Sequence, residues 1–315
     1  MVRYVRRGGP LVRHLGLIRS AARFLRGEYN NLMPVPRSAA ILLLATTACA
    51  QSPPDAAEQA KIINALRAYA EAYTTNLPNF ICSQITKREV MLAPNDVSGV
   101  RESMPGRGRL AGTGERKSTD TFEEQLGYFD HKESYQLLKV DGKKQKPGQP
   151  RPPGMTSTGE FGTTLWGVFD PQSKAEFAWK KWETLRGQTV AVFSFQVDQS
   201  HSQAQLEVPS RTVVVGYHGL IYASRDSNIV LRLTTEAESP KDFPLQDVTH
   251  LLDYGQVEIA GQPFILPLHG EMQTRMSEDF LRYGREAGHS KQVFLTNQVD
   301  FREYRKYTAE SVLKP

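Results

Sequence analysis

Residues 219–233 read Gly-Leu-Ile-Tyr-Ala-Ser-Arg-Asp-Ser-Asn-Ile-Val-Leu-Arg-Leu. Two β-prone runs, Leu220–Ala223 and Ile229–Leu233, flank the polar segment Arg225–Asn228. Polar residues between two such runs favour a turn. A link this short joins antiparallel neighbours, because parallel strands need a crossover of a dozen or more residues. The stretch therefore predicts a β-hairpin.

The same pattern extends over most of the chain. Tyr254–Ile259 and Phe264–Leu266 flank Ala260-Gly261-Gln262, which predicts a second hairpin. Residues 161–169 predict a short helical turn. Strands separated by turn-length links predict an antiparallel meander. We expect strands near residues 80–92, 121–130, 133–140, 175–183, 188–200, 204–215, 219–224, 229–237, 246–260, 263–275 and 291–307.

One segment has a helical period. Apolar residues recur at three- and four-residue steps from Ala56 to Leu77, and Asp55 is a residue type that caps helix N-termini. Pro78 ends the pattern. These features predict an amphipathic helix from about Asp55 to Thr75, the one strong helical signal after residue 50.

Two long segments, residues 93–119 and 141–163, are rich in Gly, Pro and basic residues. Glycines at 106, 108, 112 and 114 precede Arg116 and Lys117, which raises the question of a phosphate-binding loop. That loop needs a glycine directly before the lysine and a helix after it. Here Arg116 precedes Lys117, and a strand is expected next. We therefore expect two long loops and no nucleotide site.

Residues 1–50 have the pattern of an export signal. A short apolar run, residues 39–45, follows Arg37 and precedes Ala48-Cys49-Ala50, and Met33 is an alternative start. The run is shorter than the ~18–20 apolar residues that span a bilayer. Two cleavages stay open: release from Gln51, or lipidation of Cys49. We expect an exported chain in the periplasm or cell envelope, with membrane contact only if Cys49 is acylated.

The basic charge of the chain lies in this leader. Residues 1–50 hold eight arginines and one acidic residue, which leaves 31 basic and 33 acidic residues in 51–315. A slightly acidic body has no general attraction to a polyanion, so we expect no nucleic-acid partner. The hydrophobic share of 39% and the charged share of 23% are those of an ordinary globular protein.

The histidines and acids do not form a metal motif. Asp247, His250 and Asp253 would share one face of a helix, but side chains alternate along a strand. On the strand expected here, His250 points away from both aspartates. We therefore expect no metal and no cofactor.

Catalytic signals are equally weak. His218 lies between two expected strands, and Cys82 is the cysteine that remains after cleavage at Gln51. No Gly-x-Ser-x-Gly elbow accompanies them. Glu123 and Glu124 are adjacent on a strand, so they face opposite ways. We expect a backbone-satisfied turn histidine, a buried thiol and no catalytic residue.

Aromatic residues are more informative. Six lie in expected strands, and Phe193 and Phe195 share one face. Most belong to a core, but a large sheet with one helix can leave part of its inner face open to an apolar ligand. The candidate ligand-lining residues are Trp179, Trp182, Phe193, Phe195, Tyr222 and Phe264.

The order of parts carries a resemblance. An exported leader, one amphipathic helix, a first strand after Leu77–Phe80 and a long meander are together similar to the periplasmic lipoprotein-carrier superfamily of LolA/LolB-like proteins. The segments 128–133, 159–162 and 214–222 resemble an uncharacterised family of secreted bacterial envelope proteins. The resemblance implies an α+β fold: a half-open barrel of about 10–12 antiparallel strands wrapping the helix, with a hydrophobic cavity for acyl chains. It implies no catalytic motif.

The chain is thus expected to consist of a leader, residues 1–50, and a single domain, residues 51–315. The leading hypothesis is a non-enzymatic cell-envelope protein that binds a lipid, acyl chain or lipoprotein in the concave face of the sheet. The alternative is an envelope protein–protein interaction or sensing module, which would use the long loops or an exposed sheet edge. A hydrolase assembled from distant residues is the third hypothesis.

Overall fold

The computed structural model describes residues 2–4, 52–92, 116–151, 154–156, 159–284 and 291–307. The chain from Pro53 onward belongs to one compact unit, which also takes in Met1–Arg6. The helices are α1 (Ala56–Asn76), α2 (Thr163–Phe169) and α3 (Glu278–Tyr283), with the 3-10 helices η2 (Pro171–Ser173) and η3 (Gln199–His201). The strands are β1 (Val2–Tyr4), β2 (Phe80–Leu92), β3 (Arg116–Phe129), β4 (Lys132–Val140), β5 (Lys143–Lys144), β6 (Glu176–Leu185), β7 (Gln188–Val197), β8 (Ala204–Val208), β9 (Arg211–Val214), β10 (Tyr217–Ser224), β11 (Val230–Ala237), β12 (Gln246–Ile259), β13 (Gln262–Ser277) and β14 (Gln292–Lys306).

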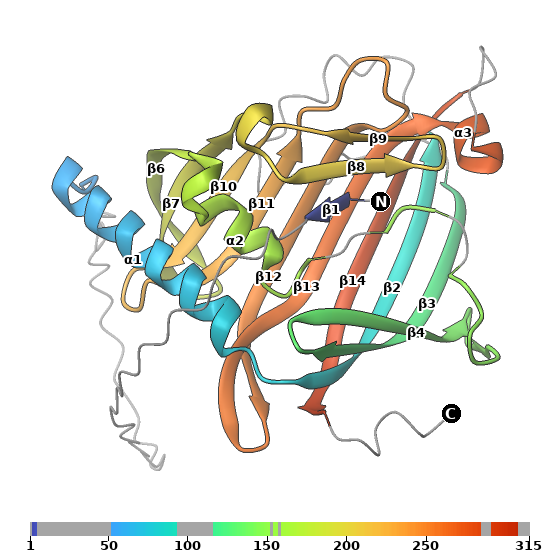
Figure 1. Cartoon of the computed structure of the whole chain (residues 1–315), viewed down its shortest axis with the longest axis horizontal. Coiled ribbons are helices and arrows are strands. Elements are labelled where there is room, and N and C mark those ends of the chain that lie inside the picture. Colours follow the sequence, from blue (N-terminus) through green and yellow to red (C-terminus); the bar gives the residue numbers. More distant parts are fainter. Residues whose placement is uncertain are drawn as a thin grey trace, which may run out of the picture. The chain divides into compact units, whose positions relative to one another are not determined.

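An 11-stranded antiparallel sheet forms most of this unit (Figure 1). Its strand order is β5-β4-β3-β2-β14-β13-β12-β11-β10-β7-β6, so that β5 and β6 are the two end strands and the sheet is open. The strands twist and bend along their length, as antiparallel strands of this size do (Figure 1). The predicted large, open antiparallel sheet is confirmed.

Two of the pairings join strands that are far apart in the chain. β2 pairs with β14 from Phe80↔Lys306 to Leu92↔Val293, so the first long strand and the last one lie side by side within the sheet. β7 pairs with β10, and the chain between them leaves the sheet. Every other neighbouring pair follows sequence order, as a meander requires.

The segment between β7 and β10 forms a second, smaller sheet. β8 pairs with β9 on one side and with β1 on the other, where Val2 lies opposite Leu206. A single strand was expected over 204–215, but Pro209 and Ser210 form a turn that divides it. β1 comes from residues expected in the leader, and the division into a leader and a single domain stays a prediction.

The other strand predictions are confirmed to within a few residues. The two hairpins become β10–β11 and β12–β13. The second turn fits its residues, because Ala260 (φ 51°) and Gly261 (φ 76°) both have left-handed backbone conformations. β3 begins five residues earlier than expected, at Arg116. The predicted loop at 93–119 lies largely outside the described residues.

Helix α1 agrees closely with its prediction. The Asp55 carboxylate accepts a hydrogen bond of 2.8 Å from the backbone N–H of Glu58, which caps the helix. Its apolar stripe is buried, and the ring of Tyr73 meets that of Tyr254 on β12 edge-on at 6.2 Å. The guanidinium of Arg67 lies 5.7 Å from the Phe177 ring of β6. Helix α1 therefore packs across one face of the sheet (Figure 1).

Two further helices occur in the described residues. α2 lies within the predicted helical turn at 161–169. α3 was not predicted, although its ends are typical: Ser277 Oγ accepts from the backbone N–H of Phe280 at 3.0 Å, and Gly284 (φ 68°) ends the helix. A helix of one and a half turns is too short to show a period, so only its caps could have revealed it.

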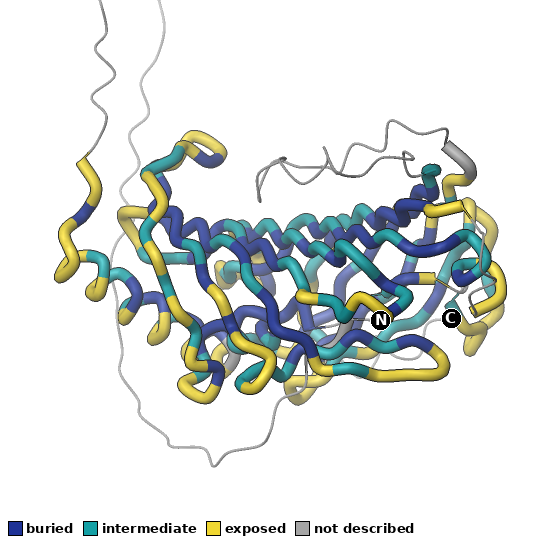
Figure 2. The backbone as a smooth tube through the Cα atoms, turned by 90° about the horizontal axis from the view of Figure 1, so that it is seen from above, coloured by how far each residue is buried: buried dark blue, intermediate teal, exposed yellow. Residues whose placement is uncertain are grey.

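The core lies mainly on the face of the sheet that α1 crosses. Side chains from α1, α2, the small sheet and the large sheet form one apolar cluster. β7 is buried on both faces, because Ala191 and Phe193 join this cluster while Val190 and Val192 join a smaller one behind the sheet. Figure 2 shows buried positions along the strands and exposed ones at the turns and along one side of α1.

Candidate ligand-binding pocket

A small pocket opens on this core face of the sheet. It has a cavity volume of about 30 Å³, and five strands and one connecting segment line it. Alternate residues of β2 and β3 point into it, as do alternate residues of β13 and β14. Its lining consists of Gln84, Thr86, Arg88, Phe122, Glu124, Arg151, Met155, Thr156, Glu160, His250, Gly270, Met272, Asn297, Val299 and Phe301.

The lining combines apolar walls with buried charges. Phe122, Met272 and Phe301 are buried apolar residues, while Arg88 and Glu124 are 6% and 2% exposed. Charged side chains are almost never this buried unless they are paired. A buried charge cluster beside methionines and phenylalanines is therefore the most unusual feature of this face.

Arg151 and Glu124 form the ion pair at the centre of the pocket. Arg151 Nε donates to Glu124 Oε1, and Gln84 Nε2 donates to Glu124 Oε2 at 3.3 Å. Burial raises the pKa of Glu124, while Arg151 and Arg88 act in the opposite direction. The two arginines therefore offset part of the effect of burial on this carboxyl.

Both arginines also lie over aromatic rings. The Arg88 guanidinium is 4.5 Å from the centre of the Phe122 ring, and that of Arg151 is 4.2 Å from the Tyr135 ring. Cation–π contacts of this kind fix the plane of the guanidinium. Gly154 (φ 145°) lies directly against Arg88, since an added Cβ would come within 2.6 Å of Arg88 Cζ. The position of Arg88 is thus tightly defined.

The segment over the pocket is fastened by polar contacts. Asn297 Nδ2 donates to the carbonyl of Met155 at 2.7 Å. Glu133 accepts from the backbone N–H groups of Gly159 (3.1 Å) and Phe161 (3.3 Å) and from the Tyr135 hydroxyl. Burial, and next the neighbouring Glu160, raise the pKa of Glu133 to about 7. Residues 154–156 and 159–161 therefore pack against β14 and β4 through groups that include a titratable carboxylate.

Some buried polar atoms of the lining residues are left without a hydrogen bond. Among the described residues, Arg151 Nη2 and Asn297 Oδ1 are buried and make no hydrogen bond. Buried polar groups in proteins are nearly always paired with protein or water. A donor and an acceptor on pocket residues are thus available to a small molecule.

His250 is the remaining titratable group of the pocket. It is buried, and burial lowers its pKa to about 4, so the ring is neutral at pH 7. As predicted, it faces away from Asp247 and Asp253, which pair with Arg275 and Arg232 at 2.7 Å. The described residues contain no group of three metal-ligating side chains.

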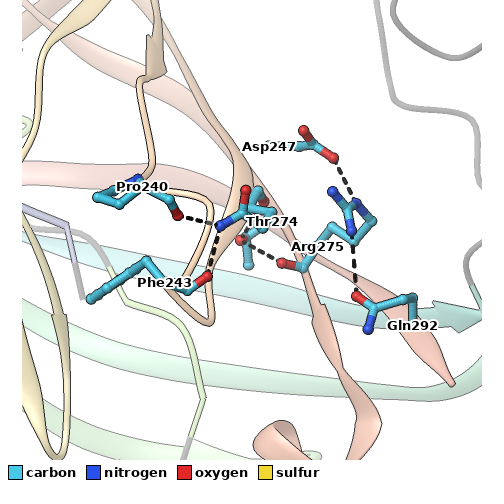
Figure 3. A network of polar contacts seen from close by, with 7 residues as sticks. Pro240, Phe243, Asp247, Thr274, Arg275 and Gln292 are labelled. Atoms are coloured by element: carbon cyan, nitrogen blue, oxygen red, sulfur yellow. Dashed lines mark hydrogen bonds and ion pairs between the residues drawn. The ribbon is translucent and has the colours of Figure 1, made fainter. Parts of the chain in front are cut away.

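A polar network fixes the start of β12, the strand that carries this histidine (Figure 3). Gln246 Nε2 donates to the carbonyls of Pro240 (2.8 Å) and Phe243 (2.7 Å). Next to it, Arg275 Nε donates to Asp247 Oδ2 at 2.7 Å. Asp247 has a left-handed φ of 50° at an irregularity in the pairing with β13. The network holds this irregular stretch in register.

The six aromatic residues predicted to line a ligand site lie elsewhere. The rings of Trp179 and Phe193 are 5.2 Å apart, and Trp182 joins them because a bulge after Trp179 turns it to the same face. Phe195 meets Tyr217 at 6.0 Å.

The last two of the six are separate from this group. Tyr222 belongs to the small apolar cluster behind the sheet, and Phe264 is partly buried against the main core. None of the six lines the pocket described above. Their role in ligand binding stays a prediction.

The residues weighed for catalysis are dispersed. Cys82 is buried, and burial raises its pKa, so the thiol is uncharged. His218 is half exposed between Glu236 (3.6 Å) and Glu238 (3.7 Å), and its pKa is raised chiefly by a hydrogen bond to Glu236. Cys49 lies outside the described residues.

The pocket residues themselves were not predicted. Glu124 was correctly expected to face away from Glu123, which pairs with Lys139 at 2.8 Å. The available signal was a polar residue at a position whose neighbours on the same face, Phe122 and Leu126, are apolar. Charged residues at such inward positions mark a buried polar site.

Comparisons with known proteins give fold neighbours only. No family model matches the sequence, and a search of curated proteins finds no match. Solved LolA superfamily structures are among its structural neighbours, as the resemblance in the sequence led us to expect. A LolA superfamily protein from Nitrosomonas europaea has 10% identity and a TM-score of 0.34, over 80% of this chain and 97% of that chain.

Two other solved structures are similar to a comparable degree. A DUF1329 family protein from Desulfovibrio piger has 9% identity and a TM-score of 0.35, over 81% of this chain and 98% of that chain. A putative outer membrane lipoprotein-sorting protein domain from Vibrio parahaemolyticus has 12% identity and a TM-score of 0.32, over 79% and 94%. Likeness at this level does not identify a function, so the proposal below rests on residues of this chain.

Proposed function

We propose that this protein is a non-enzymatic binding protein of the cell envelope that holds a lipid or acyl chain against the core face of its large sheet. The observation that carries the proposal is the pocket itself, in which buried charged residues and flexible apolar residues converge on one small space. In this proposal the pocket face is the concave one, and the sheet curves around α1.

The walls suit an acyl chain. Met155 and Met272 are buried, and methionine is unbranched and polarizable, so its side chain can move aside for an apolar ligand. The cavity of about 30 Å³ has room for on the order of two water molecules. It therefore accommodates a polar head group, while an attached chain would displace the methionines toward the apolar core.

The proposed localisation is inferred from the sequence. The apolar run at residues 39–45 and the cleavage motifs after it favour export. No described helix has the length and apolar character needed to cross a bilayer. We place the mature chain in the periplasm or at the envelope.

The direct test is native mass spectrometry of the protein purified from membranes, followed by binding of acyl compounds after delipidation. Met272→Trp fills the pocket and should reduce acyl binding at least about tenfold. Leu220→Trp is the matched control, because Leu220 packs on the apolar cluster behind the sheet. A protein that carries no lipid and binds no acyl compound would refute the proposal.

A second function is favoured by one observation. β1 adds antiparallel to β8, yet its residues lie in the leader that export would remove. Removal would leave one edge of β8 without its neighbour, and an extended segment of a partner protein can add to such an edge. In vivo crosslinking from Gln205, on β8, tests this: a specific partner crosslinked there supports strand addition, and its absence while lipid co-purifies argues against it.

A further inference from the structure

The charges of the pocket residues balance one another. Among the residues that line it, Arg88 and Arg151 carry two formal positive charges, and Glu124 and Glu160 carry two formal negative ones. His250 adds none at neutral pH, because its pKa is about 4. Two arginines in a pocket would ordinarily indicate an anion site, but here the arginines are already matched.

This balance disfavours a charged ligand. A carboxylate or phosphate that entered the pocket would lose its hydration and meet Glu124 and Glu160 as well as the arginines. An uncompensated charge in such a space is strongly unfavourable. A ligand with an ammonium group would also lose its hydration, and it would meet Arg88 and Arg151 as well as the two glutamates.

A neutral polar group meets a better-matched pocket. Arg151 Nη2 is a donor that lacks an acceptor among the described residues, and Asn297 Oδ1 is an acceptor that lacks a donor. The Asn297 orientation is fixed by its Nδ2–H, which bonds the Met155 carbonyl. A ligand that carries both a donor and an acceptor could satisfy both groups without adding charge.

We propose that the pocket selects acyl compounds whose polar head is neutral and carries both a hydrogen-bond donor and an acceptor, such as an amide or a glycerol hydroxyl, over those with an anionic head. This inference rests on the proposed function and specifies its ligand class. Phe122, Met155 and Met272 then contact the first methylene groups of the chain.

The test compares four compounds with the same C12 chain on the delipidated full-length mature protein at pH 7.5. We expect dodecanamide and monolauroylglycerol to bind at least about tenfold more tightly than dodecanoate and dodecyl phosphate, a difference of about 1.4 kcal/mol. Tighter binding of either anion would overturn the inference. Equal binding of all four would also overturn it and leave the proposed function standing, whereas no binding of any compound would refute the function itself.

Charge variants make the test specific. Glu124→Gln keeps the shape of the side chain and removes one negative charge, so the preference should reverse toward dodecanoate. Glu160→Gln should act in the same direction, which keeps the inference testable if the first variant folds poorly. Glu123→Gln is the matched control, because Glu123 faces away from the pocket and pairs with Lys139. A preference that is unchanged in both pocket variants would contradict the charge-balance explanation.

A variant of Asn297 tests the role of its unpaired acceptor, Oδ1. Asn297→Leu removes the acceptor without adding a charge and should weaken dodecanamide binding about tenfold, as expected when a buried hydrogen bond is lost. Thr296→Ser changes the adjacent residue on β14, which does not line the pocket, and should leave all four affinities unaltered. An Asn297→Leu variant that binds the amide as wild type does would overturn the assigned contact.

Discussion

Glu133 accepts hydrogen bonds from two backbone N–H groups and one hydroxyl, yet its pKa is raised to about 7. Burial outweighs the three donors, and Glu160 adds repulsion in the same direction. Tyr135 and Cys82 are the other titratable groups that interact with this carboxyl. The protonation of this one side chain therefore affects the hydrogen bonds that hold Gly159 and Phe161 beside the pocket.

The raised pKa gives stability a defined pH dependence. The usual pKa is 4.5, so between about 4.5 and 7 the folded state binds more protons than the unfolded state at Glu133. This contribution is fully present below pH 4.5 and is lost as the pH rises through 7. The variant Glu133→Gln lacks this contribution. The unfolding free energy of the wild type minus that of the variant, measured in urea titrations, should therefore decrease from pH 5 to pH 8.

The wild type must be compared with the variant, because His250 makes the unfolding free energy change with pH in the opposite direction. Its pKa is lowered from 6.5 to about 4, so its contribution to stability grows as the pH rises through that interval. A wild-type-minus-variant difference that is constant over the whole range would contradict the assignment to Glu133.

The Arg151–Glu124 pair predicts a second effect. Arg151→Met leaves a buried carboxylate without its cation, which should lower the unfolding free energy by about 2–4 kcal/mol at pH 8. The loss should be smaller at pH 5, since Glu124 can then take up a proton. Lys139→Met breaks an ion pair whose two side chains are 38% and 33% exposed, and should change stability by less than about 1 kcal/mol. Equal losses of unfolding free energy in the two variants would contradict a larger contribution from the buried Arg151–Glu124 pair.

At the scale of residues, the sequence predicted correctly which way the side chains of Glu123 and Glu124 point, but not which residue pairs with Glu124. Strand alternation placed Glu123 and Glu124 on opposite faces, which is correct. It could not indicate that Arg151, 27 residues away in a segment without regular structure, supplies the counter-charge. Side-chain period is a local property, whereas a buried ion pair depends on how distant segments meet.

At the scale of elements, the β10–β11 hairpin depends on a glycine. A Cβ added to Gly219 would lie 1.8 Å from the carbonyl oxygen of Thr234 on β11, so no larger residue fits without moving the backbone. The extended conformation of this position would accept any residue, so close approach and not φ requires glycine.

Gly219→Ala should therefore lower the free energy of unfolding by about 1–3 kcal/mol, the range seen when a packed site is overfilled. Gly270→Ala is the matched control, because its added Cβ would be 3.4 Å from the nearest atom, Leu252 Cδ2. Thermal unfolding of both variants tests the difference. A Gly219→Ala protein as stable as Gly270→Ala would show that the two strands are further apart than described.

Long elements were predictable, whereas among the short ones only α2 lay in a segment where a helical turn was expected. α1 and the long strands show several repeats of their period, which is why the sequence placed their ends to within a few residues. α3, β5 and the β8–β9 division have too few residues for a period to emerge. Their limits depend on caps and turns such as Pro209 and Gly284, and on contacts with the large sheet.

For the whole molecule, the sequence indicated a meander but not how its first and last long strands pair. The pairings β2–β14 and β7–β10 join segments that no local pattern connects. The placement of β1 beside β8 was likewise unexpected, since residues 2–4 were assigned to a leader. Non-local pairing is settled by packing of the whole sheet, which a single sequence does not reveal.

The leader gives a prediction at this scale. Intact mass of the chain recovered from its envelope should correspond to a start at Gln51, or to an acylated chain beginning at Cys49. Either result removes β1, and the two are distinguished by the mass of the acyl groups. Recovery of a chain that retains residues 2–4 would contradict export by cleavage and would keep β1 available to β8.

The pairing of β2 with β14 also determines when this molecule can fold. During synthesis β2 is made more than 200 residues before its partner, so the middle of the sheet stays incomplete until the last strand leaves the ribosome. Contacts this distant in sequence form slowly. Such a nascent chain remains unfolded for longer, which would suit the passage through a translocase that our proposal of export requires.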